Sequence, residues 1–158
     1  MSIEFEALTD FLIKAKKQTY ASHGDEAVVR SFLNGSKQLE IRSGDYLYRD
    51  IYFGFSFFAG QEMIEYKDRP IWSMVYSGGI TAPNASRETT VHLYSFLRDA
   101  LRAVNGESPY RGPQSFQANA YWYQNEVSGT FERFTGYESI QANDAKMYEL
   151  RYSGGMIL

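Results

Sequence analysis

The chain repeats part of its own sequence, and this repeat limits the folds it can adopt more than any other feature. When the sequence is shifted by 76 positions, residues 58–80 align with residues 134–156 without a gap, and nine of the 23 positions are identical. A unit that occurs twice can bury its apolar faces by packing both copies around one core. The alternative is two similar hairpins produced by common turn chemistry. The identical pairs are Phe58/Phe134, Gly60/Gly136, Glu62/Glu138, Ile64/Ile140, Asp68/Asp144, Tyr76/Tyr152, Ser77/Ser153, Gly78/Gly154 and Gly79/Gly155.

Hydrophobic periodicity places a helix ahead of each set of strands. Apolar residues at spacings of three and four predict helices over 3–17 and 87–104. Lys14, Lys16 and Lys17 close the first helix, where positive charge complements the helix dipole. Alternating segments between turn residues predict antiparallel strands. The expected strands cover residues 38–42, 45–53, 57–66, 71–76, 117–127, 129–137 and 146–152, with a loop over 78–85; the segment after residue 27 is compatible with a further short strand.

These elements predict an α+β fold. We expect a single domain over residues 1–158, with repeat 1 at about 3–80 and repeat 2 at about 87–156. Each repeat contributes a helix and an antiparallel meander, and the helices pack on the sheet in pseudo-two-fold relation.

The repeated glutamates lie on faces that are otherwise apolar. Strand alternation puts Glu62 on one side with Phe58 and Ile64, and it puts Glu138 on the corresponding side of the second copy. A carboxylate that faces a core must be neutralised, paired or hydrogen-bonded. We therefore expect both glutamates to point toward a common cleft.

Two structural alternatives compete with a ligand site. A bulge at Gly60 and Gly136 could rotate each glutamate into solvent. Each carboxylate could otherwise be a tether that accepts from a tyrosine hydroxyl or from an arginine such as Arg49 or Arg133. Such ion-pair networks shift carboxyl pKa values as readily as active sites do.

Composition excludes several function classes. The chain has no cysteine, and its two histidines, His23 and His92, are too few and too distant for an all-histidine metal centre. The net charge of −3 argues against direct nucleic-acid binding. Neither a signal peptide nor an 18-residue apolar run is evident, so we expect a cytoplasmic chain with no membrane partner and no cofactor. P-loop, dinucleotide and HExxH motifs are missing from the sequence as well.

Several motifs resemble an uncharacterised bacterial family, the domain of unknown function 5680. They are Phe58-x-Gly-x-Glu62, Trp72-x-Met-x-Tyr76-x-Gly-Gly, their counterparts from Phe131 to Gly155, Ala15-Lys-Lys-x-Thr-Tyr-Ala, and Tyr110-Arg-Gly-Pro. The resemblance covers the chain from about Phe11 onward. It implies a domain encoded alone or behind a helix-turn-helix segment in regulators, with no assigned catalytic residue.

Three functions fit these observations. The first is a small-molecule binding or sensing domain whose aromatic cleft and glutamates hold a cationic or aromatic ligand. The second is a protein-interaction module that uses sheet edges or a second copy, as a monomer or a homodimer. The third is a hydrolase that uses the glutamates as an acid/base pair roughly 5 to 9.5 Å apart. Any single aromatic could also simply fill the core. The expected ligand-binding residues are Glu62, Glu138, Tyr48, Trp72, Tyr76, Trp122, Tyr148 and Tyr152.

Overall fold

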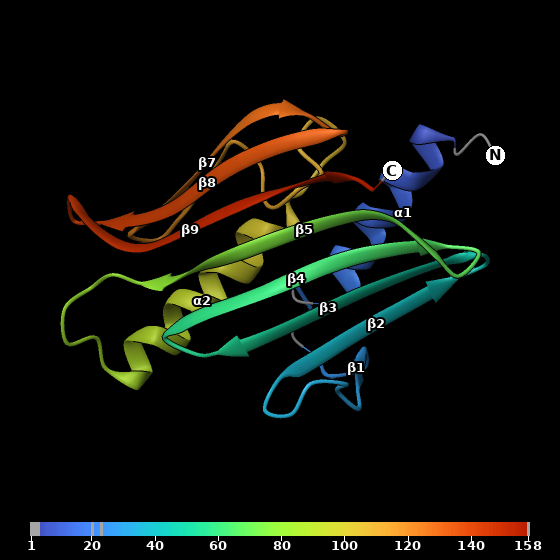
Figure 1. The fold of residues 1–158 in the computed structure, drawn as a ribbon. Helices are drawn as coiled ribbons and strands as arrows, with labels where there is room; N and C mark the ends of the chain where they lie inside the picture. The colour runs from blue at the N-terminus through green and yellow to red at the C-terminus, as the bar shows by residue number, and fades with distance from the viewer. Residues whose placement is uncertain (1–3, 20, 23, 158) are drawn as a thin grey trace.

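A computed structural model of the chain describes residues 4–19, 21–22 and 24–157. It contains two helices and one nine-stranded antiparallel sheet, in which the strands follow the order β1-β2-β3-β4-β5-β9-β8-β7-β6. The helices lie on the same side of the sheet (Figure 1), as expected for an α+β fold. The elements are α1 (Phe5–Gln18), β1 (Val28–Val29), β2 (Lys37–Ser43), β3 (Tyr46–Gly54), β4 (Phe57–Tyr66), β5 (Arg69–Ile80), α2 (Arg87–Arg102), β6 (Ser115–Ala118), β7 (Tyr121–Thr130), β8 (Arg133–Ala142) and β9 (Ala145–Met156).

The core lies between the helices and the face of the sheet that they cover, which we call the inner face. Leu8 and Leu12 of α1 and Leu93 and Leu97 of α2 are buried there. Alternate residues of the central strands meet them from the sheet, because successive strand side chains point to opposite faces. The buried aromatic and aliphatic side chains of the sheet include Tyr48, Ile64, Trp72, Met74, Tyr76, Tyr123, Phe134, Ile140, Tyr148, Leu150 and Tyr152.

The β4–β5 and β8–β9 hairpins have the same register when their residue numbers are offset by 76. Glu62 faces Met74 across the first hairpin, and Glu138 faces Leu150 across the second. The turn residues Lys67 and Asp68 have positive φ, and so do Asn143 and Asp144. In the β5–β9 pair, Tyr76 lies directly opposite Tyr152.

Several expected strand boundaries were wrong, among them the end of the last strand, which was expected at residue 152 and lies at Met156. β5 continues through residues 78–80, which were expected in a loop, because it pairs with β9 over that stretch. The expected strand 117–127 is two strands, separated by a turn in which Asn119 has a φ of 54°. The turn expected near residue 128 lies at residues 131–132, since Gly129 remains inside β7.

The helices and the short strand agree with expectation apart from their ends. The first helix begins at Phe5, and Ile3, Tyr20 and His23 lie outside the described residues. The short strand after residue 27 is β1. The second helix begins after Ser86, whose hydroxyl accepts a hydrogen bond from the Thr89 amide, as is typical of an N-cap. Neither helix in the described part of the chain has the length and apolar character needed to cross a bilayer.

Candidate functional site

Glu138 lies at the centre of a buried hydrogen-bonded network on the inner face. Its side chain is fully buried, and it accepts hydrogen bonds from Nε and Nη2 of Arg111, the latter at 2.6 Å. The hydroxyls of Tyr123 and Tyr148 donate to the same carboxylate at 2.6 and 2.8 Å. Burial raises the pKa of both tyrosines well above the ordinary value, so each remains a donor. This carboxylate is therefore neutralised by an internal cation.

Glu62 is buried in the same way, but its partner is Lys16 of α1. The Lys16 ammonium donates to Oε2 of Glu62 at 2.5 Å, and both side chains are fully buried. Desolvation lowers the pKa of Lys16, while the adjacent Glu62 opposes that shift. Oε1 of Glu62 has no hydrogen-bond partner among the described residues. The two repeated glutamates thus face inward, as alternation predicted, but different cations hold them.

The glycines two residues before each glutamate make room for the tyrosines opposite them. Gly60 pairs with Tyr76, and Gly136 pairs with Tyr152. A Cβ at Gly136 would lie 2.0 Å from Cζ of Tyr152, and one at Gly60 would lie 2.5 Å from the Tyr76 hydroxyl. The glycine two residues before each glutamate therefore leaves space for the side chain of the tyrosine that pairs with it from the neighbouring strand.

The two tyrosines donate to side chains that differ in charge. The Tyr76 hydroxyl donates to Asp50 of β3 at 2.6 Å, and the Tyr152 hydroxyl donates to Oδ1 of Asn125 of β7 at 2.8 Å. Asp50 faces Glu62 across the β3–β4 pair, and Asn125 faces Glu138 across the β7–β8 pair. The acceptor of Tyr76 is thus an acid, whereas the acceptor of Tyr152 is an amide.

A cavity of about 170 Å³ lies between α2 and the inner face of β3, β4 and β5. Aromatic and aliphatic side chains form most of its wall, and Asp50, Arg98 and Arg111 supply its charges. Glu62 and Glu138 lie outside this lining. The lining residues are Asp50, Tyr52, Gly54, Phe55, Phe58, Tyr76, Tyr94, Leu97, Arg98, Leu101 and Arg111.

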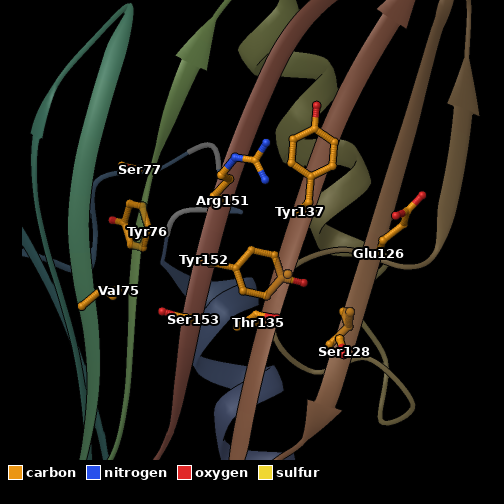
Figure 2. A pocket seen from close by; sticks show the side chains of 12 residues that line it. Val75, Tyr76, Ser77, Glu126, Ser128, Thr135, Tyr137, Arg151, Tyr152 and Ser153 are labelled. Carbon is orange, nitrogen blue, oxygen red and sulfur yellow. The ribbon is translucent and has the colours of Figure 1, made fainter.

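A larger and more open hollow of about 660 Å³ lies on the opposite, outer face of β5, β9, β8 and β7. Figure 2 shows Arg151, Tyr137 and Glu126 in a row across β9, β8 and β7, beside a second row formed by Ser153, Thr135 and Ser128. The Arg151 guanidinium lies 4.8 Å from the centre of the Tyr137 ring.

The family model of the domain of unknown function 5680 matches residues 50–157. The chain belongs to this family. Comparisons with curated proteins and with solved structures give no significant match. The family match begins at Asp50 and includes Glu62, Tyr76, Arg111 and Glu138, whereas Lys16 precedes it.

Most of the residues expected at a site in this member of the family are buried on the inner face. Tyr48, Trp72 and Tyr148 are fully buried, and Tyr76 and Tyr152 are nearly so. Of these expected residues, only Tyr76 lines the inner cavity. The others contribute to the packed core or to the Glu138 network.

Trp122 requires a correction. We expected it in the wall of the same cleft, but it is 42% exposed. It pairs with Gln141 on the outer side of β7, and its indole N–H donates to the Ser115 hydroxyl. The strand that carries Trp122 begins at residue 121 rather than 117, and Tyr123 is the residue that points inward from it.

The structural alternatives for the glutamates are partly correct. Glu138 is a tether, but its arginine is Arg111 and not Arg133. Arg49 pairs with Glu40 and Glu65 instead of Glu62. The bulges are not at Gly60 and Gly136; register shifts follow Ile64 and Ile140, beyond each glutamate, and do not turn it outward.

Sequence reasoning missed Lys16, Asp50, Arg111 and Asn125. Lys16 follows Leu8 and Leu12 at intervals of four, which places it on the apolar stripe of its helix and not only at the helix end. Asp50 lies between Tyr48 and Tyr52 on the inward register of its strand. Arg111 lies within a proline- and glycine-rich link, where no periodicity predicts which way a side chain points.

Asp50 is predicted to make stability depend on pH. Burial and the neighbouring Glu62 raise the pKa of Asp50 from 3.8 to about 7, against the opposing effects of Tyr76, Lys16 and Arg111. The unfolded chain therefore ionises this group at lower pH than the folded chain does, and its contribution to stability falls as pH rises from about 4 to about 7. At 1.36 kcal/mol per pKa unit the loss is at most about 4 kcal/mol.

The substitution D50N isolates this effect. An asparagine side chain at this position would keep the acceptor for Tyr76, as Asn125 does for Tyr152. Urea denaturation at pH 4.5, 6 and 8 should show D50N gaining stability relative to the wild type as pH rises. A difference that stays constant over this range would contradict the assignment.

Proposed function

We propose that this domain binds a compact aromatic cation in its inner cavity and that Asp50 is the charge partner of that ligand. The observation that supports this proposal is the charge balance of the buried residues. Among the described residues, the buried charged side chains are the cations Lys16 and Arg111 and the acids Asp50, Glu62 and Glu138. Two positive charges against three negative charges leave one negative charge uncompensated when all five are ionised.

That uncompensated charge is assigned to Asp50. Glu62 is paired with Lys16, and Glu138 is paired with Arg111. Asp50 accepts a hydrogen bond from Tyr76 and has no ion pair among the described residues, yet it lines the cavity. A buried carboxylate without a cation is costly. A ligand that brings a positive charge to Asp50 would remove this cost.

The cavity wall suits a ligand with one aromatic ring. Phe58, Tyr76 and Tyr94 line it, and aromatic faces attract cations as well as other rings. The volume of about 170 Å³ is close to that of a cavity of roughly 150 Å³ that accommodates benzene. A benzylamine-sized molecule is therefore a suitable probe.

The positions of the glutamates favour binding over hydrolysis. β4 and β8 are separated by β5 and β9, so their axes lie about 14 Å apart at about 4.8 Å per strand. An acid/base pair needs roughly 5 to 9.5 Å between carboxyl groups. Both carboxylates also already have internal partners.

We further propose that the sheet consists of two copies of one helix-plus-strand unit. The matching hairpin registers and the opposition of Tyr76 and Tyr152 support this. In this scheme Asp50 and Asn125 occupy equivalent places. The second copy has an amide where the first has an acid, so only the first copy offers a carboxylate to a ligand.

Thermal unfolding with benzylamine at pH 8 tests the binding proposal, because both the amine and Asp50 are then mostly charged. At 100 times the dissociation constant a ligand stabilises the folded state by about 2.7 kcal/mol, which is about 5–10 °C for a chain of this size. We expect this shift for the wild type, little shift with benzyl alcohol, and loss of the amine shift in D50N.

The matched control is E126Q, which removes an exposed acid from the outer hollow. E126Q should respond to benzylamine as the wild type does. If D50N still responds, or if E126Q alone loses the response, the assignment of the ligand to the inner cavity is refuted.

A further inference from the structure

Besides Asp50, the inner cavity is lined by a second charged group that has no ion pair among the described residues. Arg98 lies on α2, lines the cavity, and is half-buried. The structure gives it no ion pair and no hydrogen bond among the described residues, whereas the neighbouring Arg102 contacts Asp99 and the carbonyl of Ala21. A positive charge therefore lines the same cavity as the Asp50 carboxyl without a carboxylate of its own.

Arg98 and Asp50 do not neutralise each other. No salt bridge joins them within 4.0 Å, although both side chains line one cavity of about 170 Å³. The aromatic rings of Tyr52, Phe58 and Tyr94 complete the wall. The cavity is thus lined by one acid, Asp50, and by two arginines, of which Arg111 is paired with Glu138 and Arg98 has no ion pair among the described residues.

We infer that the cavity selects a zwitterionic aromatic ligand, with an ammonium group at Asp50 and a carboxylate at Arg98. This inference rests on the proposed function and specifies its ligand class. A guanidinium is a rigid donor that matches a carboxylate in two-point contact. A hydrogen bond between charged groups contributes more than a neutral one. The carboxylate therefore adds affinity that a simple amine lacks.

Three ligands that share one ring and one aminomethyl group test the inference. They are 4-(aminomethyl)benzoate, the neutral 4-(aminomethyl)benzamide, and benzylamine. Isothermal calorimetry at pH 8 with the wild type should give about 10-fold tighter binding of the benzoate than of the benzamide, equivalent to about 1.4 kcal/mol. R98Q should remove this preference, and benzylamine should bind R98Q at least as tightly as it binds the wild type, because a positive charge has been removed from the cavity that holds its ammonium group.

The control for Arg98 is R151Q, which removes an exposed arginine from the outer hollow. R151Q should keep the preference for the benzoate. If R98Q also keeps it, or if the benzamide binds as tightly as the benzoate, the zwitterion inference is wrong. In that case Asp50-dependent binding of benzylamine would still support the proposed function. Absence of binding by all three ligands would refute both.

Discussion

Replacing Arg111 with methionine is expected to lower the free energy of unfolding by about 3–5 kcal/mol, the usual cost of removing one partner from a buried ion pair. Arg111 is 3% exposed and Glu138 is fully buried. Without the guanidinium, Glu138 keeps only the hydrogen bonds from Tyr123 and Tyr148. Two neutral donors do not compensate a desolvated negative charge. Urea denaturation at pH 7 measures the loss.

A surface arginine provides the matched control for R111M. R151M is the control, because Arg151 is exposed on the outer face and a surface change of this kind alters stability by about 0.5 kcal/mol or less. Equal losses in R111M and R151M would mean that the Arg111–Glu138 pair carries no stability.

Replacing Lys16 with methionine is expected to have a comparable effect, again about 3–5 kcal/mol. The Lys16 ammonium is the cation that meets Glu62, and Oε1 of Glu62 already has no partner among the described residues. Methionine retains the apolar stem of the lysine at this buried position of α1. The loss should therefore report the unpaired carboxylate rather than a cavity. Urea denaturation at pH 7 measures this loss as well.

The double variant K16M/E62L separates charge from packing. Apolar replacement of a whole buried ion pair is often neutral or stabilising, so the double variant should recover most of what K16M loses. K14M is the control, since Lys14 is exposed on the same helix. Additive losses in the double-mutant cycle would show that Lys16 and Glu62 are not energetically coupled.

The local elements were largely predictable from the sequence because their signals are local. The helices follow from apolar spacing, and the inward direction of Glu62 and Glu138 follows from strand alternation. The boundaries near residues 78–80 and 117–132 were not predictable in the same way. The first boundary depends on pairing between β5 and β9. The second depends on which residues make turns, and that in turn depends on which strands pair: Asn119 lies in a turn, whereas Gly129 lies inside β7.

The candidate site was less accessible to sequence reasoning. Strand alternation showed that Glu62 and Glu138 lie on an otherwise apolar face, but it did not show their counter-ions. Lys16 lies at a helix end 46 residues before Glu62, and Arg111 lies in an irregular link 27 residues before Glu138. Asp50 has no motif around it. It became a candidate only when the structure showed that it lines the cavity and forms no ion pair with either buried cation.

The amino-acid sequence by itself determined that Glu62 and Glu138 would lie on the inner face, because strand alternation acts between near neighbours. Only the tertiary structure decided which buried acids are paired with an internal cation and which, among the described residues, is not. That choice depends on where α1, α2 and the segment around Arg111 bring their charges, and long-range packing sets those positions.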